Sequence, residues 1–276
     1  MSKTSKQYPT VIKAQRNRLG EAAVNWLVLG SLRRAFSQVR LKVEVGAEAP
    51  RPQARLDRPA IFYLNHSSWW DGYVTYLLAR HLLKADAYLM MDVRQLRKYF
   101  FFTWAGAFSV DRQNTRSAVE SLNYISNLLR ERRWRSLWLF PQGEIQTSSR
   151  RPLDFFGGHA AVARKLPTCY LYPVAVRYEF ATSQFPEIFM RIGPGQTVQG
   201  GALNAKALTN DTRLRLEQQL EQMNAELNAG RYSSPAAEVE NFPGYRTILR
   251  GKGSANSRFE KIFGPLLPKQ GPASKL

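Results

Sequence analysis

Short apolar runs alternate with helix-like stripes of apolar residues through the middle of this chain, and that alternation limits the fold more than any other feature. Short runs rich in aliphatic and aromatic residues are typical of buried strands, whereas apolar residues three and four positions apart predict helices. Strands and helices in alternating order predict an α/β fold with a mostly parallel sheet flanked by helices. The expected strands are 60–64, 87–91, 136–140, 169–177 and, at an edge of the sheet, 187–192; the expected helices are 72–84, 117–133, 157–165 and 211–228.

The segment after the first expected strand carries the clearest candidate for chemistry. His66 lies between that strand and the first expected helix, and Asp71 follows it five residues later. Open α/β sheets place their sites at this end of their strands. On one uninterrupted helix the two side chains would point about 140° apart, so they can meet only if His66 lies in the loop or at the helix cap. Asn65, Ser67 and Ser68 are residues of the kind that form such caps.

The chemistry of this pair has two interpretations. An imidazole can take up a proton near neutral pH, and a carboxylate on its other nitrogen fixes the tautomer and stabilises the imidazolium. Such a pair can deprotonate a substrate hydroxyl, which then attacks an electrophile without a protein nucleophile. In the structural alternative, His66 caps the helix and Asp71 complements its dipole. The spacing alone favours the structural alternative.

Three later segments change that balance. Their sequences are GAFSVDR at 106–112, FPQGEI at 140–145 and LYPVAV at 171–176. With the histidine segment, and in this order, they resemble the glycerolipid acyltransferase superfamily, which includes the 1-acylglycerol-3-phosphate (lysophosphatidate) acyltransferases. That family carries an N-H-x4-D block (the HX4D motif), a G-x-F-x-D-R-like block, F-P-E-G-T-R, and an apolar strand that ends in proline. The resemblance covers about residues 55–195.

The resemblance implies a role for each matching residue. It makes His66 the catalytic general base and Asp71 its orienting partner. Arg112 matches an arginine that contacts the acceptor phosphate, for which a guanidinium fork is well suited; outside this context it would be a surface partner of Asp111. Gly143 lies at a turn where the backbone can approach the acceptor closely. The substrate-binding residues expected from the matching blocks are Asn65, Arg112, Phe140, Pro141, Gln142, Gly143 and Glu144.

The third block departs from the family pattern. Gln142 stands in place of a glutamate, Glu144 in place of a threonine and Ile145 in place of an arginine. An amide both donates and accepts hydrogen bonds, whereas a carboxylate only accepts them. The missing arginine also removes a cation from the expected phosphate site. The acyl-transfer chemistry therefore carries over better than the identity of the acceptor, which is a lysophospholipid or a sugar hydroxyl of a glycosylated lipid.

The resemblance thus implies an O-acyltransferase of phospholipid biosynthesis with a glycerol-3-phosphate acyltransferase-like fold. It would move a fatty acyl group from acyl-CoA or acyl carrier protein, as cosubstrate, to a lysophospholipid such as 1-acylglycerol-3-phosphate. No other cofactor is expected, and no metal, because no Cys, His or carboxylate spacing suits one. The alternatives are acylation of a glycosylated, non-phosphate lipid and a non-catalytic basic membrane-binding protein. The expected domain spans 51–230, between a basic amphipathic N-terminal segment at 1–50 and a basic flexible tail at 231–276.

The charge of the chain indicates an anionic partner. The 276 residues include 40 Lys and Arg against 21 Asp and Glu, a formal net charge of +19. Such an excess suits phospholipid headgroups, nucleic acid or an acidic substrate. Much of it lies in the two ends of the chain, where each basic residue near an anionic leaflet contributes about 1 kcal/mol. We therefore expect an anionic membrane surface as partner, together with the thioester donor and the lipid acceptor, and no nucleic acid.

The apolar stretches favour attachment to a membrane without crossing it. No stretch reaches the ~20 residues needed to span a bilayer, and the N-terminus lacks the apolar core of a secretory signal. Residues 22–36 form either an amphipathic surface helix or a helix packed on the sheet. The aromatic run 99–104 suits a membrane interface, an acyl-chain tunnel or the core, and Gly157, Gly158 and His159 are placed to shape the acceptor pocket. The expected location is peripheral, at the cytoplasmic face of a membrane.

Overall fold

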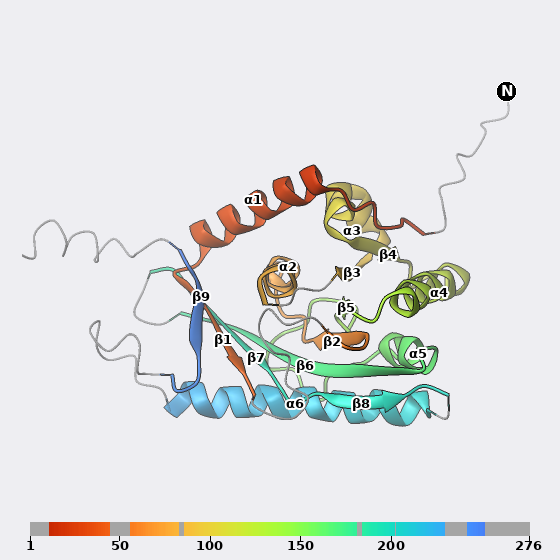
Figure 1. The fold of residues 1–276 in the computed structure, drawn as a ribbon. Helices are drawn as coiled ribbons and strands as arrows, with labels where there is room; N and C mark the ends of the chain where they lie inside the picture. The colour runs from red at the N-terminus through yellow and green to blue at the C-terminus, as the bar shows by residue number, and fades with distance from the viewer. Residues whose placement is uncertain are drawn as a thin grey trace, which may run out of the picture.

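A nine-stranded mixed sheet with helices on both faces forms the protein (Figure 1). The structure is a computed structural model and describes residues 11–44, 56–82, 86–180, 184–201, 203–229 and 242–251. The strands are β1 (Gln38–Val43), β2 (Ala60–Leu64), β3 (Asp86–Asp92), β4 (Ala107–Val110), β5 (Arg135–Leu139), β6 (Thr168–Glu179), β7 (Glu187–Ile192), β8 (Gln196–Gln199) and β9 (Arg246–Arg250). The helices are α1 (Arg18–Ala35), α2 (Asp71–Leu82), α3 (Val93–Lys98), the 3-10 helix η1 (Phe100–Ala105), α4 (Thr115–Glu131), α5 (Gly158–Arg164) and α6 (Ala205–Ala229).

The sheet has two parts that meet at β6. In the first part, the strands β4, β3, β5, β2 and β6 are neighbours in that order and all run parallel. In the second part, β7 is antiparallel to the C-terminal half of β6, β1 is parallel to β7, and β9 is antiparallel to β1. The short strand β8 pairs with the N-terminal half of β6. Parallel neighbours need crossover connections, which the intervening helices supply. The predicted α/β fold with a mostly parallel sheet is confirmed.

The central strand β2 shows why the alternation in the sequence was informative. All five of its side chains are buried, and successive side chains point to opposite faces of the sheet. Ile61 and Tyr63 pack in the cluster covered by α4, α5 and α6, while Phe62 and Leu64 pack in the cluster covered by α1 and α2. A strand that is buried on both faces gives an uninterrupted apolar run. Every strand and helix expected from the alternation is present.

The prediction that 187–192 forms an edge strand is wrong. β7 lies inside the sheet, between β6 and β1. β1 was not among the expected strands, although Val39, Leu41 and Val43 alternate with polar residues in its sequence. Its polar side chains are paired inside the protein: Arg40 Nε lies 2.6 Å from a carboxylate oxygen of Glu187, and Lys42 Nζ lies 2.6 Å from one of Glu226 on α6. Alternation of this kind is typical of a strand with one face in water, whereas in β1 the polar face is covered as well.

The domain limits expected at 50 and 231 also cut across the sheet. β1 lies in the segment expected to precede the domain, and β9 lies in the segment expected to be a flexible tail, yet the two strands pair with each other and with β7. The described part of the chain after 241 is therefore integral to the fold. The rest of the expected tail, residues 231–241 and 252–276, lies outside the described residues.

Helix α1 packs on the sheet, which was one of the two alternatives, and leaves two large apolar side chains exposed. Its side chains Val24, Val28 and Leu32 are buried in the cluster above the sheet, whereas Leu19 and Trp26 are 87% and 73% exposed. The aromatic run after α3 forms η1, which packs beside α1 and leaves the Phe100 side chain exposed. None of the helices in the described ranges is long and apolar enough to cross a bilayer.

Candidate active site

The site forms from loops that follow parallel strands. β2 leads into residues 65–70, β4 into 111–114 and β5 into 140–157. Because the carboxyl ends of parallel strands meet at one edge of a sheet, three segments far apart in the sequence lie together there.

His66 and Asp71 are in direct contact. Nδ1 of His66 lies 2.7 Å from Oδ2 of Asp71; His66 lies in the loop, and Asp71 is the first residue of α2. Since an ionised carboxylate only accepts hydrogen bonds, a ring proton of His66 lies on Nδ1, and in the neutral imidazole the lone pair is then on Nε2. The side chain of His66 is 20% exposed, whereas that of Asp71 is fully buried. The imidazole can therefore meet a substrate while its negative partner stays inside the protein.

The carboxylate of Asp71 is held by donors on both oxygens. Oδ2 also accepts the backbone N–H groups of Ser67 and Ser68, at 2.7 and 2.8 Å. Oδ1 accepts the hydroxyl of Tyr178, at 2.5 Å, from β6. A buried carboxylate is costly unless such donors replace its water. Tyr178 is a residue of this site that the sequence motifs did not indicate.

Asn65 fixes the start of the loop. Its amide continues the pairing of β2 with β6, because Oδ1 accepts the backbone N–H of Val176 at 2.8 Å and Nδ2 donates to the Val176 carbonyl at 3.0 Å. The side chain is buried. A structural part, anchoring the loop that carries His66, fits Asn65 better than contact with a substrate.

The third block supports His66 from the other side. The Phe140 ring stacks on the imidazole, with centroids 4.3 Å apart. Oε1 of the buried Gln142 accepts the backbone N–H of His66 at 2.7 Å, and its Nε2 donates to the side chain of Gln146 at 2.7 Å. The backbone N–H of Gln146 in turn donates to the His66 carbonyl, at 2.9 Å. Gln142 thus uses both its accepting and its donating capacity to fix the backbone of His66.

Arg112 reaches the same rim through the Gly143 turn. Gly143 has a φ of +73°, which few other residues adopt, and a Cβ there would overlap the Arg112 guanidinium. The guanidinium carbon lies 5.3 Å from the centre of the Phe156 ring, a favourable cation–π arrangement. Asp111 does not pair with it in the described contacts, since its carboxylate accepts the backbone N–H of Gln113. Arg112 is thus exposed beside the Gly143 turn.

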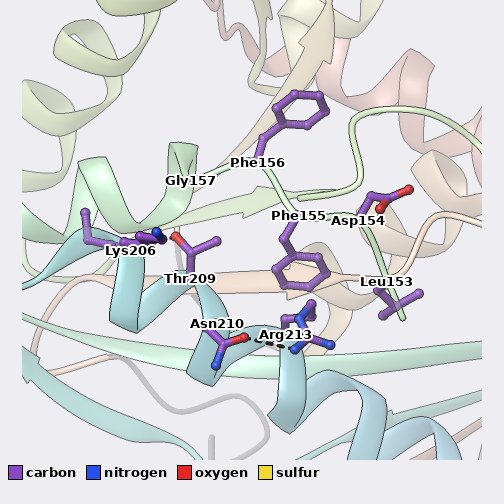
Figure 2. Close-up of a pocket in the computed structure, with 10 residues that line it drawn as sticks. Leu153, Asp154, Phe155, Phe156, Gly157, Lys206, Thr209, Asn210 and Arg213 are labelled. Carbon is purple, nitrogen blue, oxygen red and sulfur yellow. Dashed lines mark hydrogen bonds between the residues drawn. The ribbon is translucent and has the colours of Figure 1, made fainter. Parts of the chain in front are cut away.

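A cleft of about 610 Å³ adjoins the third block. Its walls are the segment 153–157 and the first turns of α6, and Phe155 and Phe156 point to opposite sides of that segment (Figure 2). The segment is held by a 2.8 Å hydrogen bond from the Phe156 backbone N–H to the Pro141 carbonyl. Lys206 and Arg213 contribute cations to the α6 wall. The surface next to the site is thus basic and partly aromatic.

The residues of the third block differ in their exposure to solvent. Pro141 and Gln142 are buried, so they shape the loop, whereas Glu144 and Ile145 are exposed at its surface. His159 does not shape the pocket as expected: it is fully buried and its Nε2 lies 2.8 Å from Thr212 Oγ1 of α6. Among the described residues, no cluster of three or more His, Cys, Asp or Glu side chains could hold a metal ion.

Comparison with known proteins identifies a family for this part of the chain. A family model described as Acyltransferase matches residues 42–177, which contain all four motif segments. Residues 42–177 belong to this acyltransferase family. A solved structure similar to this acyltransferase is that of the 1-acyl-sn-glycerophosphate (LPA) acyltransferase PlsC from Thermotoga maritima, at 16% identity and a TM-score of 0.45, with 75% of this chain and 77% of that chain covered. No curated protein matches the acyltransferase.

Membership makes the protein an enzyme of the O-acyltransferase class. Acyl transfer to oxygen requires that a hydroxyl lose its proton as it attacks, and His66 is the imidazole at the rim of this site. Tyr178 lies one residue beyond the segment that the family model matches, so the contact to Asp71 comes from outside the matched region.

Proposed function

We propose that this acyltransferase moves a fatty acyl group from an acyl thioester, acyl-CoA or acyl carrier protein, to a hydroxyl of a lysophospholipid such as 1-acylglycerol-3-phosphate. The observation that carries the proposal is the His66–Asp71 pair, in which a buried carboxylate holds Nδ1 of a partly exposed imidazole. That arrangement leaves an unprotonated Nε2 as a general base, and a charge that stabilises the imidazolium once it forms.

The reaction follows from that base. Nε2 of His66 takes the proton of the acceptor hydroxyl while the oxygen attacks the thioester carbonyl carbon. The tetrahedral intermediate collapses, the carbon–sulfur bond breaks, and the leaving thiolate takes the proton from the imidazolium. The ester product and a free thiol result, and His66 returns to its neutral form. No covalent acyl-enzyme is needed, because the acceptor oxygen itself is the nucleophile.

Arg112 supports a phosphate-bearing acceptor. Its guanidinium is exposed beside the Gly143 turn, and none of the carboxylates in the described ranges forms an ion pair with it. A guanidinium presents parallel N–H groups that match two oxygens of one phosphate. We assign to it the phosphate of 1-acylglycerol-3-phosphate.

A glycosylated lipid without phosphate is the second candidate, and Ile145 favours it. This side chain is 52% exposed at a position where the family carries an arginine. An Arg112→Ala variant separates the two acceptors. If the acceptor carries a phosphate, KM for lysophosphatidate should rise about tenfold or more. An unchanged KM, together with turnover of a glycolipid, would favour the second candidate.

We propose that the protein attaches to the cytoplasmic face of a membrane through the outer side of α1. Leu19 and Trp26 are exposed there, and Arg33 and Arg34 are exposed in the last turn. An amphipathic indole and cations beside it suit an anionic headgroup layer. Flotation with anionic vesicles should recover the protein, and flotation with zwitterionic vesicles should recover much less. Equal recovery from both would argue against a role for charge.

The decisive experiment is a product assay. Purified protein is incubated with palmitoyl-CoA or palmitoyl acyl carrier protein and a panel of lysophospholipids and glycolipids, and the products are identified by mass spectrometry. His66→Ala should abolish transfer, while its far-UV circular dichroism and vesicle flotation stay unchanged. A folded His66→Ala variant with full activity would exclude the mechanism. Vesicle binding without any acyl product from the parent protein would favour a non-catalytic role.

A further inference from the structure

Tyr178, near the C-terminal end of β6, contacts the proposed catalytic pair. Its hydroxyl donates to Oδ1 of Asp71 at 2.5 Å, while the other oxygen of the same carboxylate accepts from His66. A hydroxyl–carboxylate distance this short is typical of a charge-assisted hydrogen bond. One buried carboxylate therefore connects the phenol of Tyr178 to the imidazole of His66.

The phenol is placed to remain a donor. Its ring packs against Phe36 of the segment after α1, with centroids 5.8 Å apart. Burial, and next the neighbouring charge of Asp71, hold the pKa of Tyr178 well above its ordinary value. The phenol thus keeps its proton throughout the pH range in which an imidazole titrates.

We propose that Tyr178 is a positioning residue of this acyltransferase, which holds the Asp71 carboxylate against His66 and offsets part of its negative charge. This inference rests on the proposed general-base role of His66. Asp71 needs enough charge to stabilise the imidazolium, but a carboxylate without the phenol would hold the proton on His66 more tightly. The Tyr178 hydroxyl thus makes it easier for the His66 imidazolium to lose its proton and return to the neutral form.

Few other ionisable groups face this pair in the described part of the chain. The neighbours of Tyr178 along β6, Arg177 and Glu179, form an ion pair of 2.7 Å with each other, and Arg177 reaches Asn224 of α6 on the opposite face. From the third block the neutral rings and amides of Phe140 and Gln142 face His66. The elements packed on Asp71 and Tyr178 present Ser67, Ser68 and Phe36, which do not titrate.

The consequence is a shift in the pH profile. Removing the phenolic O–H leaves more negative charge on Asp71, and this charge favours the imidazolium form of His66. The base is then protonated at higher pH than in the parent enzyme. In Tyr178→Phe, the acidic limb of the kcat/KM profile should therefore move up by about half a pH unit. At neutral pH kcat should fall by about threefold to tenfold, while KM for the acceptor stays within about twofold.

Replacement of Tyr178 by 3-fluorotyrosine tests the same bond in the opposite direction. A more acidic phenol is a stronger donor, so the acidic limb should move down while the shape of the side chain is nearly kept. This arm decides the question if Tyr178→Phe does not fold. Tyr63→Phe is the matched control, because it deletes a buried hydroxyl that makes no hydrogen bond to the described residues and lies on the other face of the sheet. Its profile should not move.

The outcomes separate this inference from the proposed function. If His66→Ala is inactive and the two Tyr178 variants shift the acidic limb in opposite directions, the tuning role is supported. If His66→Ala is inactive but both Tyr178 profiles coincide with that of the parent enzyme, the role of Tyr178 is overturned and the general base stands. If His66→Ala keeps full activity, the proposed mechanism itself fails.

Discussion

Two histidines in this acyltransferase have similar surroundings but differ in what they can do. Both lie beside an aromatic ring, His66 on Phe140 at 4.3 Å and His159 on Tyr63 at 5.8 Å between centroids. Both contact a side-chain oxygen, at 2.7 Å for His66 and 2.8 Å for His159. In His66 that oxygen belongs to a carboxylate, whereas in His159 it belongs to the hydroxyl of Thr212. Neither ring stacking nor a hydrogen bond distinguishes a base from a structural histidine.

The difference lies in charge and in access to solvent. His66 is partly exposed and its partner is a carboxylate, so its ring faces solvent beside a buried negative charge. His159 is fully buried beside a neutral partner, and burial lowers its pKa to about 4. It is therefore neutral at pH 7 and acts as a polar part of the core. In the proposed mechanism, the carboxylate, more than the imidazole, is therefore the feature that makes His66 a base.

The largest effect is expected from removing that carboxylate charge alone. In Asp71→Asn the amide oxygen can still accept from His66 and the backbone of Ser67 and Ser68, while its NH2 group faces the oxygen of Tyr178. Geometry is kept and the charge is lost, so His66 comes to resemble His159. Activity should fall by about 10²- to 10⁴-fold, measured as kcat/KM at pH 7.5.

Asp211→Asn is the control for that loss. This carboxylate is exposed on α6 and pairs with Arg215, so neutralising it should change activity by less than about twofold. If Asp71→Asn retained more than a tenth of the parent activity, the comparison would fail, because the negative partner would not be what separates the two histidines.

An intermediate effect is expected at Gln142, which gives His66 a backbone support that the described contacts do not give His159. An ionised Gln142→Glu side chain would still accept from the His66 N–H but would face the side-chain oxygen of Gln146. Gln146 could turn its amide so that its NH2 group donates to residue 142. Its side-chain oxygen would then face the carboxylate of Asp154, which now accepts a hydrogen bond from Gln146 Nε2 at 3.4 Å. A shift of the loop should lower kcat about tenfold and leave the KM of the donor nearly unchanged.

Gln146→Glu adds the same charge to the side chain that accepts a hydrogen bond from Gln142. It also places a carboxylate oxygen against Asp154, but that contact is long, at 3.4 Å, and Asp154 is exposed and paired with Arg150. Since a carboxylate at 146 can still accept from Gln142, this variant should be tolerated better. Steady-state kinetics of both variants, with circular dichroism to verify folding, make the test. Equal losses would show that any added negative charge in the loop is harmful, and that the direction of the hydrogen bonds is unimportant.

The sequence predicted the local part of the site and missed the long-range part. His66 and Asp71 are five residues apart, so the loop and the helix start decide their contact, and cap-forming residues between them signal it. Tyr178 reaches Asp71 across 107 positions, through the length of β6 and its place beside β2. It shares the alternation of Val174 and Val176, which put it on the α2 face, but only the assembled sheet shows how close it comes.

The fold divides in the same way. β2 and β5 lie in the parallel part of the sheet and bury most of their side chains. Their apolar runs therefore predict them from the sequence. β1 and β9 lie at the other end, where Arg40, Lys42 and Arg191 are paired with carboxylates against α6 or β7. The partners of these charges lie far away in the sequence, so the sequence does not show that β1 continues the sheet beyond β7, and β7 was expected at the edge.

The smallest effect on activity, but a clear one on stability, is expected at His159. Its pKa of about 4 lies below the unfolded value of 6.5, so between these values the unfolded chain binds more protons than the folded one. The stability that depends on this group is therefore present above pH 6.5 and is lost as pH falls towards 4. A shift of that size corresponds to about 3 kcal/mol.

His159→Gln removes the titration and keeps a group that can donate to Thr212. It should keep kcat/KM within about threefold of the parent value and lower stability at pH 7 by about 1–2 kcal/mol, owing to poorer packing. Its urea midpoint should then fall less steeply between pH 6.5 and 4 than that of the parent enzyme, because the variant no longer has a neutral imidazole to protonate. A variant whose midpoint fell as steeply would show that His159 does not cause the acid sensitivity, and a loss of activity as large as that of Asp71→Asn would place both histidines in the chemistry.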